Sequence, residues 1–529
     1  MLKLLTVNDV DTKNKVVFVR ASFDVPLDSA KGLLDPKRVR DDSRIKDAVS
    51  TLSHLIKNNA KIILEGGWLG RPKGEDPDLS MAPVALRLQE LLREEGLLKH
   101  PVLLTPNCLD GSKPRSVYRN KDEVKRDIAK LKEGQVILLE NVRYDPEANA
   151  TDQQFAEFIA SLAGNNAVYV NEAEAHNHRP EATITNVPIL IANNGGKAVF
   201  GLKVSEVIKY LGNIAKLLEK KERGPFIFFL SGKKIETQVG ITSKITVTHA
   251  LLNKMKEGDV IFVQGAVVYT FLIAEKYMEI IEQHLDELLK AIDGYNIKIK
   301  EETSRIKKEI KENASEIALK AQETIQKEKS DRLKEIIGIT DDEIRHLIGN
   351  SFVEWKEIGE QIMFAAQLYL KSRSKKVDVI INADHTITNR FPDKFGNLPK
   401  DAELKEFGSP VGIPEGWLGV APGQKSLDII CGKVRKAFMI ILAGPLCIEE
   451  PRVEEFSKTN GKLLHAVREA KGKGAITIAA GGDTAAMVKT YGGADAFTVV
   501  SNAGGATLEL IEKNGRLPGI EAVENACKH

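Results

Sequence analysis

The sequence predicts an α/β protein built from two Rossmann-like lobes, each a doubly wound parallel sheet, joined by a hinge helix and carrying an inserted helical hairpin. Short, continuously apolar, β-rich runs alternate with longer amphipathic stretches, which is typical of parallel strands covered on both faces by helices. The length of 529 residues is enough for about two to four domains. One long charged segment lacks strand signals, which indicates a helical insertion.

Strand candidates fall into two series along the chain. The first series lies in 15–20, 60–67, 134–141 and 166–173, and the second in 225–232, 258–266, 378–384, 438–445, 474–482 and 496–505. Helical patterns separate the strands, as in two doubly wound domains. We place a boundary near residue 200, because the glycine-rich "LIANNGGKAVFG" precedes the helical pattern "KVSEVIKYLGNIAKLLEKKE". The N-terminal lobe is therefore expected over residues 1–200.

The insertion is expected over residues 278–346. We predict one helix over 278–292, a break at the "DGYN" of 293–296, and a second helix over 300–337, the two pairing as an antiparallel hairpin. The "TDDE" that follows has capping-box spacing and starts another helix. Two interpretations stay open: a solvated arm without a role, or an arm for self-association or a protein partner. The second helix carries one apolar stripe, formed by Ile306, Ile310, Ala314, Ile317, Ala321 and Ile325.

Composition excludes several classes of protein. Lysine plus arginine (76) nearly balances aspartate plus glutamate (74), so nothing indicates nucleic acid or a membrane as partner. The four cysteines are far apart and form no CxxC, which argues against a disulfide framework or a zinc cluster and favours a reducing compartment. The chain contains no apolar run of about 18 residues, and its start turns polar too soon for a signal peptide. A cytoplasmic protein is expected.

Arginines gather at strand and helix ends in the N-terminal half. Ligands of open α/β sheets bind outside the carboxyl ends of the strands, and guanidinium groups suit phosphates and carboxylates. Four arginines after different strands predict a cradle for a small, multiply charged anion, with Arg20 as a possible fifth. The four are Arg44, Arg71, Arg143 and Arg179.

The C-terminal half offers glycines and one acid instead. Asp483 and Thr484 follow two glycines at a predicted helix start, where a carboxylate suits Mg²⁺ on nucleotide phosphates, although such an acid is most often a simple cap. Gly504 and Gly505 open another helix with phosphate-binding geometry, and the chain has no Walker A motif. Lys234, beside Lys233, is placed to reach phosphates. A nucleotide on one lobe and a small anion on the other imply phosphoryl transfer.

With these motifs in view, the sequence resembles phosphoglycerate kinase over nearly the whole chain, except the 278–346 insertion and the segment 109–121. Eleven motifs occur in the order of that family: "VRASFDVP", "DDSRI", "LGRPKG", "LLENVRY", "VNEAEAHNHR", "VYTFL", "IGNSFVE", "IPEGWLG", "AGPLCIEE", "GGDTAA" and "GGATLELIE". The resemblance implies an N-terminal lobe for 3-phosphoglycerate or its 1,3-bisphosphate. It also implies a C-terminal lobe for Mg·ADP or Mg·ATP over 201–510, and a tail, 511–529, that packs back on the first lobe.

The resemblance also implies roles for particular residues. In the first lobe, Arg44 matches the arginine that neutralises the moving phosphoryl group, and the substrate is bound by Ser22, Asp24, Arg71, Arg143 and Arg179. In the second lobe, Gly504 and Gly505 match the glycines that meet the transferring phosphoryl group. The nucleotide is bound by Lys234, Pro445, Glu450, Asp483 and Thr484, with Asp483 on Mg²⁺.

The sequence departs from the family's pattern at several positions. Trp68 replaces a histidine of the substrate site, Gln238 replaces the second lysine of a phosphate loop, and Glu181 stands where a histidine is common. The acid of the usual "DFN" has moved from the position of Ser22 to Asp24. These departures leave two alternatives beside an active phosphoglycerate kinase. One is a catalytically weakened binding or scaffold protein, and the other is an acyl-phosphate kinase for another small acid.

Overall fold

The computed structural model describes residues 4–149, 151–232, 244–265, 267–309, 314–348, 358–390, 398–409, 411–447 and 453–527. The chain forms two compact units, and each is described by itself. Unit 1 consists of Met1–Ile214 with Asn502–His529, and unit 2 of Ala215–Ser501. The sequence-based limits of the functional lobes, at residues 200 and 510, stay predictions.

Unit 1 is built on a parallel sheet, six-stranded in the part of the chain described, with the order β3-β4-β2-β1-β5-β6. The four predicted strands are its centre: β1 (Val16–Arg20), β2 (Lys61–Glu65), β4 (Val136–Leu139) and β5 (Val168–Asn171). The sequence analysis missed both edge strands, β3 (Leu103–Thr105) and β6 (Lys197–Phe200). Edge strands need no long apolar run, since one side of each lacks a neighbouring strand, and three or four residues give little pattern to detect.

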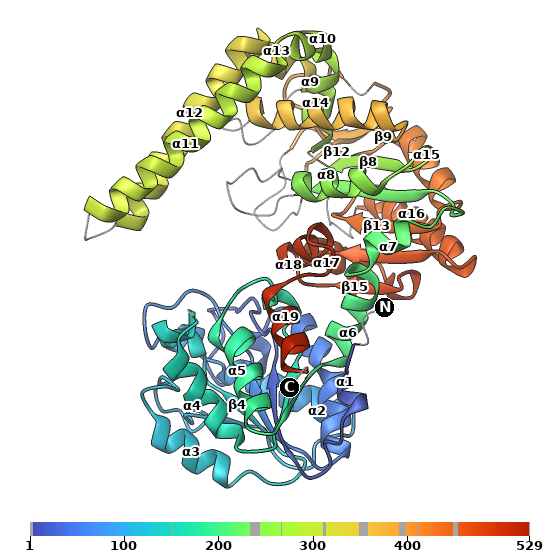
Figure 1. Ribbon diagram of the computed structural model, residues 1–529. Helices are drawn as coiled ribbons and strands as arrows, with labels where there is room; N and C mark the ends of the chain where they lie inside the picture. The colour runs from blue at the N-terminus through green and yellow to red at the C-terminus, as the bar shows by residue number, and fades with distance from the viewer. Residues whose placement is uncertain are drawn as a thin grey trace. The chain divides into compact units, whose positions relative to one another are not determined.

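The helices of unit 1 include those that cover its sheet and α18, which contacts α6 and the 3₁₀ turn Glu174–His176 (Figure 1). They are α1 (Ser43–Lys57), α2 (Ala82–Glu94), α3 (Lys121–Ala129), α4 (Gln153–Ala163), α5 (Ala182–Asn193), α6 (Leu202–Leu211), α18 (Gly505–Glu512) and α19 (Pro518–Ala526). The C-terminal helix α19 packs against α5 and β6. Gly519 makes this approach possible, because an added Cβ would lie 2.3 Å from Asn177 Oδ1.

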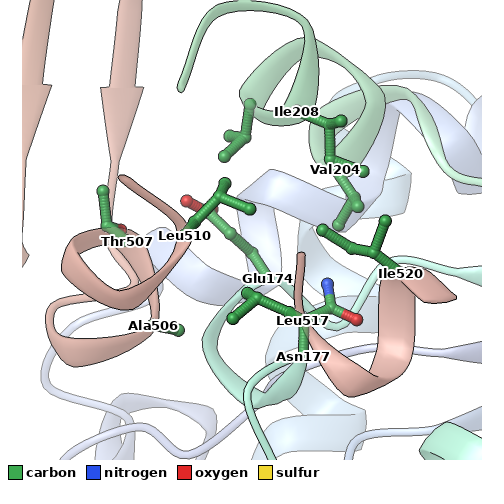
Figure 2. Close-up of a pocket in the computed structure, with 10 residues that line it drawn as sticks. Glu174, Asn177, Val204, Ile208, Ala506, Thr507, Leu510, Leu517 and Ile520 are labelled. Carbon is green, nitrogen blue, oxygen red and sulfur yellow. The ribbon is translucent and has the colours of Figure 1, made fainter. Parts of the chain in front are cut away.

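A small cavity lies where α6, α18, α19 and the 3₁₀ turn Glu174–His176 meet (Figure 2). Its volume is about 10 Å³, which is room for about one water molecule. The side chains around it are mostly apolar, among them Val204, Ile208, Leu510 and Ile520. The cavity is therefore a packing gap between helices and is too small for an organic ligand.

The first turn of α6 is capped from outside the helix. Leu202 N donates to Thr51 Oγ1 at 2.8 Å, while Lys203 N and Val204 N donate to the Glu172 carboxylate at 3.2 and 3.0 Å. Gly201, the residue before the helix, has no room for a side chain, since a Cβ would lie 2.3 Å from Glu172 Oε2. Burial raises the pKa of Glu172 to about 7, against the hydrogen bonds from Thr51 and the helix, which lower it.

The Glu172 carboxyl makes stability depend on pH. Its pKa is about 7 in the folded chain and 4.5 ordinarily, so between these values the folded state binds more protons than the unfolded state. The free energy of unfolding is therefore expected to fall as pH rises from 4.5 to about 7, and to level off above. Urea unfolding across this range should show a smaller slope for Glu172→Gln. Glu206→Gln, on the exposed face of the same helix, is the control and should keep the slope; equal slopes in all three proteins would contradict this role.

Unit 2 contains a second parallel sheet with the order β15-β14-β13-β7-β8-β9, six-stranded within the described ranges. All its strands were predicted: β7 (Phe226–Gly232), β8 (Val260–Gly265), β9 (Asp378–Ile380), β13 (Met439–Ala443), β14 (Ile476–Ala480) and β15 (Val499–Ser501). The predicted fold class is therefore confirmed. A small antiparallel sheet was missed because its strands are short and give no long apolar run: β10 (His385–Thr388), β11 (Leu404–Phe407) and β12 (Leu418–Pro422), in the order β11-β10-β12.

The helices of unit 2 include those that flank its parallel sheet and those of the insertion (Figure 1). They are α8 (Lys244–Lys254), α9 (Val267–Lys276), α10 (Met278–Gln283), α11 (Leu285–Glu309), α12 (Ala314–Ile337), α13 (Asp341–Ile348), α14 (Ile358–Lys375), α15 (Gln424–Val434), α16 (Glu454–Gly472) and α17 (Gly482–Thr490). The short helix α7 (Ile214–Leu218) spans the boundary with unit 1. Among the described residues, no helix is both long and apolar enough to cross a membrane.

The insertion forms the predicted hairpin, but its helices have other limits. Helix α11 continues through the "DGYN" at 293–296, so the predicted break is wrong. Pairing with α12 outweighs the cost of about 1 kcal/mol for Gly294, and Asn296 is part of this pairing, since its Oδ1 accepts from Lys329 Nζ at 3.2 Å. The predicted apolar stripe is only partly buried: Ile306 and Ile325 lie inside the hairpin, while Ile317 is exposed. The capping box is confirmed, because Thr340 and Glu343 exchange hydrogen bonds at the start of α13.

Candidate active site

The carboxyl ends of the central strands of unit 1 meet around a buried ionic cluster. Arg20, the last residue of β1, has no exposed surface. Its guanidinium lies 3.1 Å from Glu65 Oε1 at the end of β2, donates to Glu181 Oε2 at 2.9 Å and to Thr183 Oγ1 at 2.9 Å, and contacts His176 Nδ1 at 3.2 Å. Its third nitrogen donates to the Ala21 carbonyl. The suggestion of Arg20 as a fifth cradle arginine is therefore wrong: it joins three loops and offers nothing to a ligand.

Burial decides the protonation of this cluster. It raises the pKa of Glu65 and raises that of Glu181 to about 7, although Arg20 pulls both down. Burial and the charge of Arg20 together hold the pKa of His176 well below its ordinary value, so the imidazole is neutral. One guanidinium therefore faces two carboxyls, and the cluster takes up a proton near neutral pH.

The predicted residues Arg44 and Asp24 are in contact with each other. Arg44, in the first turn of α1, donates to the Asp24 carbonyl at 2.6 Å and lies 3.9 Å from its Oδ2. The other carboxylate oxygen of Asp24 accepts from Gly70 N at 3.1 Å, in the loop after β2. The Arg44 side chain keeps 29% of its surface exposed, so part of it is open to solvent and to an anion.

Trp68 occupies the centre of the arginine group. The guanidinium carbon of Arg143 lies 4.1 Å from the centroid of the indole and that of Arg179 lies 4.9 Å from it. The ring of His176 packs against the same indole, with centroids 5.5 Å apart. Arg143 is fixed further by a 2.6 Å hydrogen bond to the Gly70 carbonyl. A tryptophan here thus positions two cationic side chains by cation–π contact.

Two predicted substrate residues form fewer side-chain interactions than the others. Arg71 is exposed, and its side chain forms no hydrogen bond or ion pair in the described part of the chain. The Ser22 hydroxyl is buried and has no hydrogen-bond partner among the described residues. Burial lowers the pKa of Arg143, and the charges of Arg179 and Arg71 lower it further. The structure thus brings three of the four predicted arginines, Arg71, Arg143 and Arg179, close enough to repel one another, and a bound anion would relieve that repulsion.

In unit 2, glycines let the carboxyl ends of neighbouring strands approach closely. Gly444 follows β13 with a φ of +120°, and a Cβ there would lie 2.4 Å from the Ser231 carbonyl oxygen at the end of β7. Its N–H donates to Thr484 Oγ1 at 2.8 Å, and Thr484 donates to the Ala480 carbonyl at 2.9 Å. The predicted nucleotide residue Thr484 is thus buried and ties α17 to the sheet. The predicted Pro445 is half-buried, and its carbonyl accepts from the Ser231 hydroxyl.

Asp483 stands exposed in the first turn of α17, and no hydrogen bond or ion pair is formed by its side chain within the described ranges. A single free carboxylate fits Mg²⁺, which keeps several waters and binds phosphate oxygens alongside one or two protein carboxylates. The described residues contain no cluster of three His, Cys, Asp or Glu that would hold a metal by itself. Gly504 and Gly505 begin α18, where an added Cβ would meet nothing within 4 Å. Lys234, Glu450 and Gln238 lie outside the described residues.

Sequence reasoning missed three features of this site. In the sequence, the ionic cluster was indicated only by Glu65, an acidic residue at the end of an apolar strand. The link from Asp24 through Gly70 to Arg143 depends on loop conformation, which a single sequence does not give. A pocket formed by Trp68, Lys73 and Arg119 brings together residues from distant segments.

Two parallel α/β sheets, one with arginines and the other with glycines and an acid at the strand ends, define a two-domain phosphotransferase. The sequence model of the phosphoglycerate kinase family matches residues 7–346 and 343–514. The chain therefore belongs to the phosphoglycerate kinase family. Enzymes of this family are phosphotransferases with a carboxyl group as acceptor and use ATP and ADP.

The similar proteins match this chain along almost its whole length. It is 30% identical over 523 residues to a phosphoglycerate kinase of Dictyoglomus turgidum, covering 99% of this chain and 98% of that one. It is 29% identical over 527 residues to that of Anaeromyxobacter sp. (strain Fw109-5), covering 99% and 100%. Among solved structures, phosphoglycerate kinase from Coxiella burnetii covers 99% of both chains with a TM-score of 0.62 at 22% identity. That from Pyrococcus horikoshii OT3 gives 0.64 at 16%, covering 99% and 100%.

Proposed function

We propose that the protein catalyses reversible phosphoryl transfer between 1,3-bisphosphoglycerate and ADP, giving 3-phosphoglycerate and ATP. The observation that carries this proposal is that Arg143 and Arg179 gather on Trp68, while Arg44 is tied to the same loop through Asp24 and Gly70, in a chain of this family. Phosphoryl transfer needs little covalent chemistry from a protein. It needs positioning and neutralisation of charge, which arginines, glycine N–H groups and a metal-binding carboxylate supply.

Each predicted residue has a part in the proposed reaction. Arg71, Arg143 and Arg179 hold the phosphate of the acid, with Ser22 and Asp24 beside them. Arg44 neutralises the phosphoryl group in transit. On the nucleotide side, N–H groups at the start of α18 meet the same group at Gly504 and Gly505. The remaining nucleotide contacts in the proposal are Lys234, Pro445, Glu450, Asp483 and Thr484.

Mg²⁺ is part of the proposal, with Asp483 as the protein carboxylate that binds it. When bound, the metal would neutralise charge on the nucleotide phosphates. The exposed position and free oxygens of Asp483 support this assignment. We also propose a cytoplasmic location; a relative from Triticum aestivum, 28% identical over 522 residues, is named a cytosolic phosphoglycerate kinase. A self-association role for the helical insertion stays a prediction, for which Ile297, Ile317 and Leu319 supply exposed apolar side chains.

A coupled spectrophotometric assay with 3-phosphoglycerate and Mg·ATP tests the proposal. The wild-type chain is expected to turn over, and Asp483→Asn to lose about 10²-fold in kcat/KM for Mg·ATP, because one metal contact is lost. Asp286→Asn, which removes an exposed carboxylate from the first turn of α11, is the matched control and should act as wild type. No wild-type turnover at millimolar substrates would reject the function, and equal loss in both variants would reject the role of Asp483.

A further inference from the structure

One hydrogen bond joins the two parts of the chain that make up unit 1. Asn502 is the first residue of the C-terminal part and directly follows β15. Its Nδ2 donates to Asp47 Oδ2 at 2.8 Å. Asp47 lies in α1 three residues after Arg44, a spacing that puts both side chains on one face of the helix. The hydrogen bond therefore connects the helix that carries Arg44 to the segment that leads into Gly504 and Gly505.

Further contacts fix α18 to the rest of unit 1. The helix contacts α6 and the 3₁₀ turn that contains Ala175. At its start, Ala503 and Ala506 form an apolar cluster with Ala175. Just after its end, an added Cβ on Gly515 would lie 2.7 Å from the Gly212 carbonyl oxygen, so the two backbones are in close contact. Helix α18 is thus packed at both ends, and the bond from Asn502 fixes the chain just before its first turn.

The surroundings of Asp47 make its carboxylate a well-placed acceptor. The side chain is half-buried. Burial raises the pKa of Asp47, while the charges of Lys203 and Arg44 and the hydrogen bond from Asn502 lower it. Hydrogen bonds to a charged group are stronger than those between neutral groups, which suits a contact that fixes a backbone segment. Neither Asp47 nor Asn502 lies in the eleven motifs that the chain shares with its family.

We propose that Asp47 is a positioning residue, which through Asn502 holds the turn of Gly504 and Gly505 in place relative to Arg44. In the proposed reaction, the N–H groups of this turn and the guanidinium of Arg44 act on the same phosphoryl group, so their spacing has to match one group in transit. A small displacement of the turn would slow the transfer while leaving the substrates bound. The effect on turnover rests on the proposed function; the effect on the turn does not.

Steady-state kinetics of a double-mutant cycle test the effect on turnover. Asp47→Ala is expected to lower kcat about tenfold, with both KM values within about twofold of wild type. Asp47→Asn keeps an oxygen that accepts from Asn502, so it should retain most of kcat. Asn502→Ala should lose as much as Asp47→Ala, and the double variant no more than either, because both changes remove the same hydrogen bond. Additive losses, or equal losses in Asp47→Asn and Asp47→Ala, would overturn the inference.

Hydrogen–deuterium exchange of the full chain without substrates tests the effect on the turn. Amides at the start of α18 should exchange faster in Asp47→Ala than in wild type, and at the wild-type rate in Asp47→Asn. Asn502→Ala gives the same comparison if Asp47→Ala does not fold. Ser50→Ala, which removes an exposed hydroxyl from the same face-to-solvent side of α1, is the matched control and should change neither exchange nor kcat.

The exchange measurement needs no turnover, so the two proposals fail separately. A wild type that does not convert 3-phosphoglycerate, with faster exchange in Asp47→Ala, would reject the proposed function and support the role of Asp47 in holding the turn. A wild type that turns over, with unchanged exchange in Asp47→Ala, would reject this inference alone.

Discussion

Arg44→Ala is expected to lower kcat of the phosphoryl transfer about 10³-fold, since an arginine on the transferred group contributes roughly 10³–10⁵ in such reactions. The geometry supports so large a loss. Arg44 is anchored on the carbonyl of Asp24 at 2.6 Å, while part of its surface stays open to solvent. Its charge is therefore held in place before the substrate binds, and no reorganisation is needed during the reaction. Steady-state kinetics with the same coupled assay give the measurement.

Two further variants separate charge from position in this experiment. Arg44→Lys keeps the charge but loses the planar fork, so it should recover only part of kcat. Arg40→Ala removes an exposed arginine four residues earlier and should leave kcat unchanged. If Arg44→Ala raised KM for the acid while kcat stayed constant, Arg44 would contribute only to binding, and its proposed role in the transition state would be wrong.

Arg20→Met is expected to destabilise unit 1 by about 3–5 kcal/mol, the usual cost of removing one partner from a buried ionic group. Glu65 and Glu181 would then be buried without a cation, and Thr183 and His176 would lose a donor. The loss should be smaller at about pH 5 than at about pH 8, because protonation removes the uncompensated charge. Urea unfolding at both pH values measures the difference.

A rescue variant makes this prediction specific to charge. Arg20→Met/Glu65→Gln/Glu181→Gln removes the cation together with both carboxylates, so it should be more stable than Arg20→Met at about pH 8. If the rescue variant were as unstable as the single variant, the loss would come from packing around the guanidinium. The role of the cluster as an electrostatic junction of three loops would then be contradicted.

The sequence predicted best where the pattern is long and repeated. Strands β1, β2, β4 and β5 are continuously apolar because helices cover both faces, and all were found. Edge strands β3 and β6 and the antiparallel β10 to β12 give no such pattern. The break predicted at "DGYN" failed because local propensity is weak, and contact with α12 decided the conformation of α11.

The candidate site, too, was predicted only in part. Arginine as a residue type was enough to predict an anion site, but not to separate buried Arg20 from half-exposed Arg44. That difference depends on Glu65, at the end of β2, and on Glu181, just before α5. The pocket of Lys73 and Arg119 could not be predicted, because the two residues lie 46 positions apart and meet only through loop conformation.

The helical insertion has a consequence for the connectivity of unit 2. Arg332, near the end of α12, contacts Glu287, near the start of α11, at 3.1 Å, so the chain leaves and returns at nearly the same point. The backbone hydrogen bonds of α11 and α12 are formed within each helix, and α12 also packs on α14 near Ser330. Because the two ends of the insertion are neighbours, its length does not disturb the order or the register of the strands on either side. A short bridge in place of the arm is therefore expected to leave every strand of the parallel sheet with the same neighbours.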